Sequence, residues 1–488
     1  MRMPTTVKTW LIVLAVLAAA IFAIRLTGIA DLEDNSQARN VGYAIDLVER
    51  GNWLVQYDLQ GRILSKPPLH TWLVGILAEP FGLNRFTLSV PSFLAVVGTT
   101  WLVFGIGRRR FGLLAGGLAG LSMVMSQMMW RQMTMVRSDA LFSLAIAGGA
   151  WAAFRAWETG RGWLLFWVCG AIAMLTKGPL GLLLASAGLL AWFWEQRTHP
   201  PAPRPGGSHR WGIVAFFAIC LAWIVPALWF HGKPLIDKMI FDELLGHVTS
   251  ADNSRVASNF AMRVLTPTIN FLTRFVPFSL FACFGIFRAF RWPAQDESER
   301  RFERFLTCWI LVGMLIFTIA AHHRADLLLP LWPAGALLSG RELARLTERM
   351  GSGKSAWASA AACLILVAAA WFNYHPVTPG ILKPFRRSLD VRNAADAFRK
   401  TGIDPGRLQF INSPATFQYY LGNSSRWKTP EQILASRSPG PDRMWVVTAG
   451  ANIDPKDFAG VESTEVFRWV PENGGEPVVR VFELKWSL

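Results

Sequence analysis

The sequence predicts an all-α polytopic membrane bundle of about eleven transmembrane helices, followed by a small soluble α/β domain. Three observations support this fold class. Hydrophobic residues make up 52% of the 488 residues and fall in blocks of about twenty, the length that crosses a hydrocarbon core of roughly 30 Å. Basic residues gather in alternate loops between these blocks. The long apolar blocks end near residue 374, where the composition changes.

The apolar blocks give the expected spans. We expect helices near 9–28, 86–106, 112–130, 138–156, 162–176, 178–195, 211–231, 269–289, 305–321, 326–340 and 356–372. Many of the 23 tryptophans stand at block ends, where an amphipathic ring suits the membrane interface: Trp53, Trp72, Trp130, Trp163, Trp211 and Trp332. The linker Thr198–His209 is rich in proline and glycine, so we expect it to be flexible.

The distribution of arginine and lysine predicts the orientation. The basic loops contain Arg2 and Lys8; Arg108, Arg109 and Arg110; Arg155 and Arg161; Arg197, Arg204 and Arg210; Arg288, Arg291, Arg300, Arg301 and Arg304; and Arg341, Arg345, Arg349 and Lys354. Short loops this basic belong in the cytoplasm. The N-terminus is then cytoplasmic, and an odd number of spans puts the C-terminus outside. The first helix has no small-residue cleavage site, so no cleavable signal is expected.

This topology predicts two domains and three external segments. Residues 1–373 form the transmembrane domain, whose external loops are 29–85 and 232–268. Residues 374–488 form a soluble external, or periplasmic, domain of roughly 110 residues. Short apolar runs at Leu408–Ile411, Met444–Val447 and Val478–Leu484 suggest strands, and Val391–Lys400 suggests an amphipathic helix ended by Gly402.

Composition also excludes several classes of function. The five cysteines all lie inside apolar blocks and have no metal-ligand spacing, so neither a disulfide framework nor a zinc site is expected. The net charge of +16 comes from the cytoplasmic loops, which argues for membrane lipids and against nucleic acid as partner. No cofactor follows from the sequence, and a divalent cation is left open.

The first external loop carries the first candidate acid. Asp31, Glu33 and Asp34 follow the first helix directly. Asp34 with Gln37 three residues later is an acceptable capping box for the following helix. The alternative is a carboxylate at the membrane surface that acts as a general base or metal ligand, and one carboxylate could serve both roles.

Further along this loop, Arg62 and Lys66-Pro67-Pro68 allow two readings. Two prolines fix an extended backbone, so the segment could be a rigid loop with a snorkelling lysine. The alternative is a lysine and an arginine that meet a phosphate at the bilayer edge. Lys177 interrupts two apolar runs, where a charge is expensive unless it snorkels or meets an anion.

Two further clusters lie on the same predicted face. Asp139 follows Arg131 and Arg137 at the start of a helix, where an aspartate is more often a cap than a catalyst. His322-His323-Arg324-Ala325-Asp326 contains a histidine pair that could bind metal but fits a solvated turn better. Cations and carboxylates from different loops therefore converge outside the membrane: Lys66, Arg137, Lys177 and Arg324, with Asp34, Asp139 and Glu243. This combination suits an anionic lipid headgroup and an acceptor that must lose a proton.

Five motifs in order resemble one family over roughly residues 10–345. They are Gly51-Asn52-Trp53 followed by Lys66-Pro67-Pro68-Leu69 and Trp72; Phe81-Gly82 with Val90-Pro91-Ser92; Arg137-Ser138-Asp139; Leu175-Thr176-Lys177-Gly178-Pro179; and Leu328-Leu329-Pro330-Leu331-Trp332-Pro333. The chain thus resembles the bacterial protein O-mannosyltransferase and aminoarabinose lipid A transferase group, polyprenyl-phosphate-sugar-dependent glycosyltransferases of the GT-C fold.

The resemblance implies transfer of a sugar from a polyprenyl (undecaprenyl-type) monophosphate to a lipid, glycan or protein acceptor outside the cytoplasmic membrane, with inversion at the anomeric carbon. A first-loop carboxylate would deprotonate the acceptor, with Asp34 and Asp139 as catalytic candidates. Basic residues would hold the leaving phosphate. The substrate-binding candidates are Arg39, Arg62, Lys66, Arg137, Lys177, Glu243 and Arg324.

The chain departs from the family pattern at two places. The family has an Asp-Glu pair that is followed, after one intervening residue, by an arginine, whereas this chain has Ser36-Gln37 before Ala38-Arg39. The acid is either displaced to Asp34, one turn earlier, or missing, and we favour Asp34. Leu327 replaces the family's tyrosine. Two other functions stay open: a degenerate relative that binds the lipid carrier without turnover, and a transporter or flippase, although neither midplane charges nor inverted repeats are found.

Overall fold

The computed structural model describes residues 6–28, 32, 35–245, 260–319, 324–350, 361–369, 386–435, 443–448, 461–470 and 478–485. These residues form two compact units. The first contains Met1–Arg25, Ser65–His70 and Ser89–Tyr374, and the second contains Leu26–Leu64, Thr71–Leu88 and His375–Leu488. The second unit therefore combines residues of the first loop with the C-terminal part of the chain.

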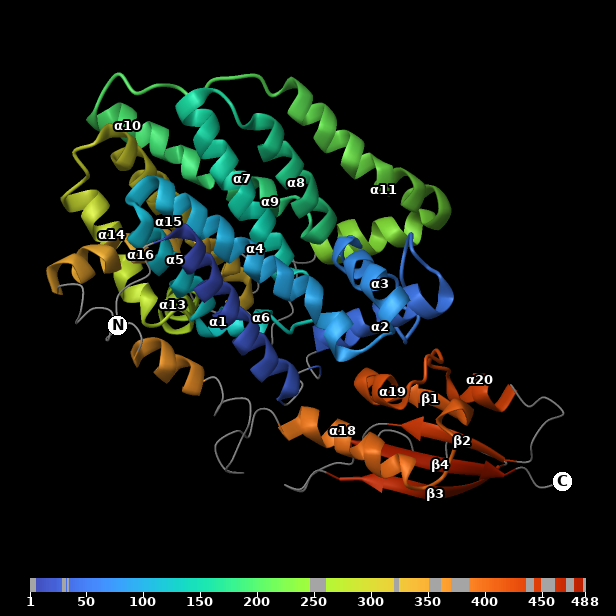
Figure 1. Cartoon of the computed structure of the whole chain (residues 1–488). Coiled ribbons are helices and arrows are strands. Elements are labelled where there is room, and N and C mark those ends of the chain that lie inside the picture. The colour runs from blue at the N-terminus through green and yellow to red at the C-terminus, as the bar shows by residue number, and fades with distance from the viewer. Residues whose placement is uncertain are drawn as a thin grey trace. The chain divides into compact units, whose positions relative to one another are not determined.

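The first unit is a helical bundle (Figure 1). Its elements are α1 (Val7–Thr27), α4 (Arg85–Phe111), α5 (Leu113–Val124), α6 (Gln127–Gln132), α7 (Asp139–Thr159), α8 (Trp163–Lys177), α9 (Leu180–Ser186), η1 (Ala187–Leu190), α10 (Ala191–Thr198), α11 (Arg210–Ile236), η2 (Asp237–Leu245), α13 (Phe260–Arg274), α14 (Phe278–Arg291), α15 (Glu297–Ile319), η3 (Ala325–Leu331) and α16 (Trp332–Met350). Residues 361–369 are also helical.

Within the described residues, five helices are long and apolar enough to cross a membrane, and a bent pair would make a sixth. They are α1, α4, α7, α15 and the helix from Arg210 to Met239. The prediction of a polytopic helical bundle is confirmed in kind, while the expected number of spans stays a prediction.

Several expected spans are broken, and the prediction of one helix at 269–289 was wrong. The chain there forms α13 and α14, which meet at an angle of 117°. Pro277 lies at the break and favours it, because proline lacks an N–H donor and disfavours helical geometry at Val276. The span expected at 112–130 divides into α5 and α6, and the Trp130 indole donates to the Val124 carbonyl at the break. The span expected at 326–340 begins as η3 and continues as α16.

The linker between α10 and α11, expected to be flexible, contacts the helical bundle, and its flexibility stays a prediction. Three indole N–H groups of α7 and α8 donate to it: Trp157 to the Pro203 carbonyl, Trp163 to the Gly206 carbonyl and Trp167 to His209 Nδ1. Trp163 was expected at the interface but is buried, as are Trp130 and Trp332. Each of these indoles serves packing inside the protein instead.

Small residues let the helices of the bundle approach closely. A methyl group added at Gly340 of α16 would lie 2.5 Å from the Ala115 carbonyl oxygen of α5. One added at Gly117 of α5 would overlap the Trp10 ring of α1, at 2.2 Å. Such close backbone contacts are typical of helices that pack inside a membrane.

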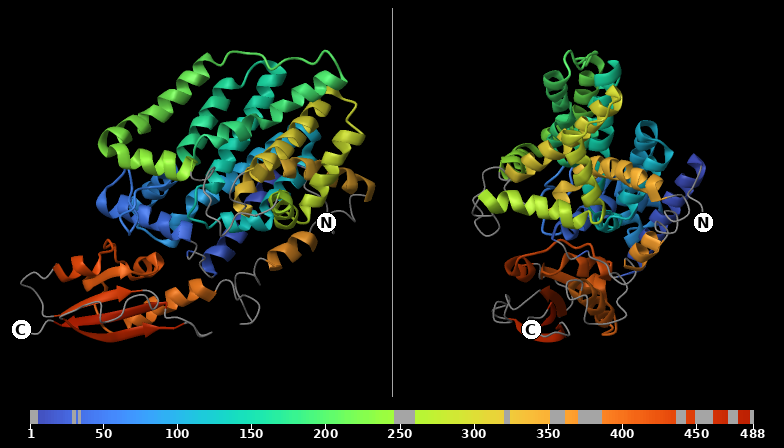
Figure 2. Two further views of the ribbon diagram at one scale, coloured as in Figure 1. Left: turned by 180° about the vertical axis from the view of Figure 1, so that it is seen from behind. Right: turned by 90° about the vertical axis from the view of Figure 1, so that its left-hand side faces the viewer.

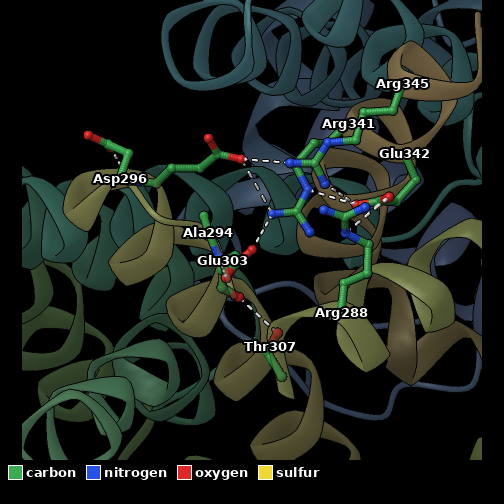
Figure 3. Close-up of polar contacts among 9 residues, drawn as sticks. Arg288, Ala294, Asp296, Glu303, Thr307, Arg341, Glu342 and Arg345 are labelled. Carbon is green, nitrogen blue, oxygen red and sulfur yellow. Dashed lines mark hydrogen bonds and ion pairs between the residues drawn. The ribbon is translucent and has the colours of Figure 1, made fainter. Parts of the chain in front are cut away.

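A largely buried ion network joins α14, α15 and α16, in which Arg288 Nε of α14 lies 3.7 Å from Glu342 Oε2 of α16 (Figure 3). Arg341 Nη1 lies 2.5 Å from Glu303 Oε2, and Arg341 Nε lies 2.9 Å from Glu342 Oε1. Arg345 joins Glu342 at 3.0 Å and Glu299 at 3.1 Å. Several arginines expected in cytoplasmic loops are thus helix residues in ion pairs, because α15 begins at Glu297 and carries acids that the predicted span left outside.

The second unit contains α2 (Asn35–Arg50), most of α3 (Leu69–Phe81), and the C-terminal elements α18 (Arg386–Arg399), η5 (Pro405–Arg407), β1 (Leu408–Asn412), α19 (Ala415–Leu421), α20 (Pro430–Ala435), β2 (Arg443–Thr448), β3 (Glu462–Trp469) and β4 (Val479–Lys485). The strands predicted from the short apolar runs are confirmed as β1, β2 and β4, and β3 was missed. The helix expected at Val391–Lys400 is confirmed as the larger part of α18.

The strands form one mixed sheet of order β1-β2-β4-β3, with β1 parallel to β2 and the other pairs antiparallel. Val447 packs with α18 and α19 on one face, and Val446 packs with α20 on the other, because successive strand residues point to opposite sides. Helices therefore lie on both faces of the sheet (Figure 2), which confirms the small C-terminal α/β fold.

Candidate functional site

The centre of the candidate site is Arg137, a buried arginine between two carboxylates of the first unit. Its Nε lies 3.0 Å from Asp139 Oδ2, and its Nη1 lies 2.6 Å from Asp326 Oδ2. Only 2% of the Arg137 and Asp139 side chains and 8% of the Asp326 side chain are exposed. Arg137 therefore joins the start of α7 to η3, segments that are far apart in the sequence.

Lys177 completes this group from the end of α8. Its Nζ donates to Asp139 Oδ1 and lies 5.5 Å from the centroid of the Phe142 ring. Lys177 is the last residue of α8, where a cation is favoured by the carbonyl end of the helix. Gly178 follows with a φ of +112°, which permits the turn into α9.

Asp139 is not the cap of its helix. The N-cap position belongs to Ser138, and Asp139 is the first residue of α7. Both carboxylate oxygens of Asp139 are engaged by cations, one by Arg137 and one by Lys177. The capping interpretation was therefore wrong, and the carboxylate instead holds two cations in fixed positions.

A buried serine links the Lys66 loop to this cluster. Ser92 Oγ lies 2.6 Å from the Met135 carbonyl oxygen, 3.2 Å from the Arg137 carbonyl oxygen and 3.3 Å from His70 Nε2. Burial lowers the pKa of His70 to about 4, against the opposing effect of Asp139, so the imidazole is neutral at pH 7. Lys66, four residues before His70, is close enough to act electrostatically on Asp139.

The segment before Arg137 is also held by buried hydrogen bonds. The buried Arg25 of α1 donates from Nε to Thr134 Oγ1 at 2.9 Å. Ser89 Oγ of α4 lies 3.2 Å from the Thr134 carbonyl oxygen. Arg131 then projects toward the cluster with 39% of its side chain exposed, and its Nη1 is 3.9 Å from Asp326 Oδ1.

Among the residues that the structure describes, this group holds more cations than acids. Its cations are Arg137, Lys177, Lys66 and Arg131, and its acids are Asp139 and Asp326. Arg137 is enclosed by the acids, whereas Arg131 and the partly exposed Lys66 can reach a ligand. A preorganised excess of cations suits an anion such as a phosphate, whose charge grows when it leaves a carbon atom.

The other predicted site residues lie elsewhere or outside the described part of the chain. Arg324 is exposed and directly precedes η3, the element of Asp326. Arg39 and Arg62 belong to the second unit, where Arg62 pairs with Asp58 at 2.8 Å. Asp34 is not among the described residues, nor are His322 and His323. The Glu243 backbone lies in η2, and its side chain is outside the description.

Sequence reasoning did not select Asp326, His70 or Ser92 for the site. Asp326 stood at the start of an expected span, and that position beside basic residues was the available signal. His70 and Ser92 gave none beyond the family motifs that contain or adjoin them. Among the described residues, no group of three or more His, Cys, Asp or Glu could hold a metal ion.

Three kinds of comparison agree on what this chain is similar to. Residues 65–230 match the family model of dolichyl-phosphate-mannose-protein mannosyltransferase. The undecaprenyl phosphate-alpha-4-amino-4-deoxy-L-arabinose arabinosyl transferase 1 of Pseudomonas fluorescens (strain Pf0-1) is 23% identical over 372 residues, 71% of this chain and 60% of that protein. The transferase of the same name from Enterobacter sp. (strain 638) is 25% identical over 70% of this chain and 63% of that protein.

Solved structures extend the similarity to the fold. The crystal structure of ArnT from Cupriavidus metallidurans bound to undecaprenyl phosphate matches with a TM-score of 0.75 at 14% identity, over 98% of both chains. An Archaeoglobus fulgidus oligosaccharyltransferase structure matches with a TM-score of 0.53 at 14% identity, over 86% of this chain and 57% of that one.

These findings confirm the resemblance predicted from the motifs, and the chain has the GT-C fold. Its apolar helices and its relatives indicate a multi-pass protein of the inner membrane. The matched region spans only about three fifths of the length of the two relatives, 60% and 63%.

Proposed function

We propose that this chain, a GT-C protein of the aminoarabinose transferase type, moves a sugar from an undecaprenyl-type polyprenyl monophosphate to an acceptor on the periplasmic face of the inner membrane. The observation that carries the proposal is the cluster of cations that the described residues bring together around Asp139 and Asp326. The two relatives are named as undecaprenyl phosphate-4-amino-4-deoxy-L-arabinose transferases, which favours that class of sugar and carrier. The lipid A acceptor is proposed from the family resemblance of the motifs.

The leaving phosphate is the group that the cation cluster serves. During transfer the bond between the anomeric carbon and the phosphate oxygen breaks, and the bonding electrons stay on the phosphate. Lys66, Lys177 and Arg131, with the exposed Arg324, would stabilise this growing charge. A unit cation about 4 Å from a unit anion contributes about 4 kcal/mol at an effective dielectric constant near 20.

The acceptor oxygen or nitrogen forms the new bond to the anomeric carbon from the opposite face, so the configuration inverts. Its proton must go to a base as the bond forms. Asp139 is poorly suited to this role because both of its oxygens are held in ion pairs. We therefore assign Asp139 to positioning Lys177 and Arg137, and keep Asp34 of the first loop as the proposed base. Contacts of Arg39, Arg62 and Glu243 with substrate stay predictions.

Orientation is part of the proposal. The basic loops predict a cytoplasmic N-terminus, and the expected odd number of spans would put the C-terminal domain in the periplasm. The polyprenyl tail would then stay in lipid while the acceptor arrives from the periplasmic side.

Sugar transfer by the purified chain in lipid nanodiscs tests the proposal. Undecaprenyl phosphate-aminoarabinose and lipid A are supplied, and product is measured by mass spectrometry. We expect transfer by the wild type and a loss of about 10²–10³-fold in Lys177→Met, the usual effect of removing one group that stabilises developing negative charge. Lys8→Met is the matched control, since Lys8 is exposed on the predicted cytoplasmic side.

Two results would overturn the proposal. Carrier binding without turnover, with this and other polyprenyl-phosphate sugars and glycan or protein acceptors, would favour the binding-only relative. Movement of the carrier across liposomes without sugar transfer would favour a flippase.

A further inference from the structure

The second unit contains a fully buried carboxylate that takes no part in the candidate site. Asp46 lies on α2 in the first loop, with 0% of its side chain exposed. Its Oδ1 accepts from Arg50 Nη1 at 2.9 Å and from Arg426 Nη2 at 3.1 Å. Its Oδ2 accepts from Asn52 Nδ2 and from the Tyr57 backbone N–H, both at 2.9 Å. Every oxygen of this carboxylate therefore has two donors.

Three of these donors belong to the first loop itself, whereas Arg426 belongs to the C-terminal part of the chain. The Arg426 guanidinium also lies 5.2 Å from the centroid of the Tyr57 ring. Next to it, the Trp427 backbone N–H donates to the Leu59 carbonyl oxygen at 2.9 Å. In return, Arg50 of α2 donates to the Ser424 carbonyl oxygen. The first loop and the segment Ser424–Trp427 thus exchange contacts in both directions.

The segment that carries Arg426 is itself rigidly held by the C-terminal fold. Gln418 of α19 donates to the Ser425 carbonyl oxygen at 2.8 Å and accepts from the Trp427 indole at 2.5 Å. The Lys428 backbone N–H donates to the Phe410 carbonyl oxygen of β1 at 2.8 Å. Arg426 is therefore fixed with respect to the sheet, and α19 packs against α2.

We propose that the C-terminal domain positions the first loop for catalysis by holding Asp46 of α2 with Arg426. This inference rests on the proposed function, because α2 begins at Asn35, directly after the proposed base Asp34. Asp46 lies on the same helix, eleven residues beyond Asn35. A displacement of about 1 Å at a reacting group can cost about 100-fold in rate. Asp46 and Arg426 are thus positioning residues.

The variant Arg426→Ala tests the inference in the full-length protein in nanodiscs. Because 43% of the Arg426 side chain is exposed, truncation leaves no cavity in the domain core. We expect kcat to fall by about tenfold or more while the KM for the lipid donor stays near that of the wild type. Arg443→Ala is the matched control: Arg443 is an exposed arginine of the same domain that pairs with Glu483, and its loss should leave kcat unchanged.

A double-mutant cycle identifies the partner. Asp46→Asn should lower kcat at least as much as Arg426→Ala, because it also weakens the contacts with Arg50, Asn52 and the Tyr57 N–H. Adding Arg426→Ala to Asp46→Asn should lower kcat little further, because the Asp46–Arg426 pair is already weakened. Arg426→Lys keeps the charge and should restore part of the rate. Additive losses in the double variant would contradict the proposed pairing.

Hydrogen exchange separates this inference from the proposed function. In Arg426→Ala, amides of residues 35–50 should exchange faster while those of β1, β2 and β4 stay protected. An active wild type with an equally active Arg426→Ala variant would overturn the positioning role. An inactive wild type would refute the proposed function. Unchanged exchange of the α2 amides in Arg426→Ala would then refute, independently, the claim that Arg426 holds α2 in place.

Discussion

Removing Arg137 should destabilise the protein more than removing any exposed arginine of the same loop. The Arg137 side chain is 2% exposed and lies 3.0 Å from one carboxylate and 2.6 Å from another. In Arg137→Gln, Asp326 loses its closest cation. Among the described residues its remaining ion-pair partner is Arg131, whose Nη1 lies 3.9 Å from Asp326 Oδ1. Breaking a buried ion pair by removing one partner costs about 3–5 kcal/mol. Domains have only about 5–15 kcal/mol of stability, so this loss is large.

Thermal unfolding of the purified protein in detergent measures this effect. Arg131→Gln is the matched control, because 39% of the Arg131 side chain is exposed and such a pair contributes about 0–1 kcal/mol. Adding Asp326→Asn to Arg137→Gln removes the stranded charge and should recover part of the lost Tm. If Arg137→Gln and Arg131→Gln melt at the same temperature, the buried triad does not hold η3 to α7.

Three further outcomes test other parts of the structure. Gly340→Val should lower the free energy of unfolding by about 1–3 kcal/mol, because the added side chain pushes α16 away from α5. Gly105→Ala is the control and should leave stability unchanged, because nothing lies within 4 Å of the added carbon. The Tm of each variant measures the effect. Ser92→Ala should cost about 1–3 kcal/mol, again seen in Tm, because it strands buried polar partners. Hydrogen bonding from Arg468 lowers the pKa of Glu465 from 4.5 to about 2. Because the pKa of Glu465 is lower in the folded protein, the ionised carboxylate stabilises the fold fully above about pH 4.5, and this stabilisation is lost as the pH falls toward 2. Glu465→Gln should therefore make hydrogen exchange in β3 and β4 less sensitive to acid.

The elements that the sequence predicted well are those governed by local physics. Long apolar runs predicted α1, α4, α7 and α11 to within a few residues, because their composition suits a hydrocarbon environment. Short apolar runs predicted β1, β2 and β4. The strand β3 was missed because its residues alternate between exposed and half-buried, so no apolar run marks it. The break between α13 and α14 was marked by Pro277, yet Pro226 lies inside α11, so proline alone does not decide where a helix ends.

The candidate site shows the same division. Lys177 was recognisable because a charge between two apolar runs requires a partner. The partner itself was not recognisable: Asp139 lies 38 residues from Lys177, and Asp326 lies 189 residues from Arg137. Only folding brings these charges together, and it changed the interpretation of Asp139 from a helix cap to a holder of two cations. The docking of Arg426 on Asp46, 380 residues apart, was equally invisible to local pattern.

The fate of the lipid carrier tests the proposed transfer reaction most directly. Purified wild-type protein is given undecaprenyl phosphate-aminoarabinose and lipid A, and mass spectrometry counts both the sugar transferred and the polyprenyl monophosphate released. We expect one monophosphate to be released for each sugar transferred, and a loss of more than about 10³-fold in the rate of transfer by the double variant Lys66→Met with Lys177→Met. Equal rates in the wild type and the double variant would contradict the claim that these cations stabilise the leaving phosphate.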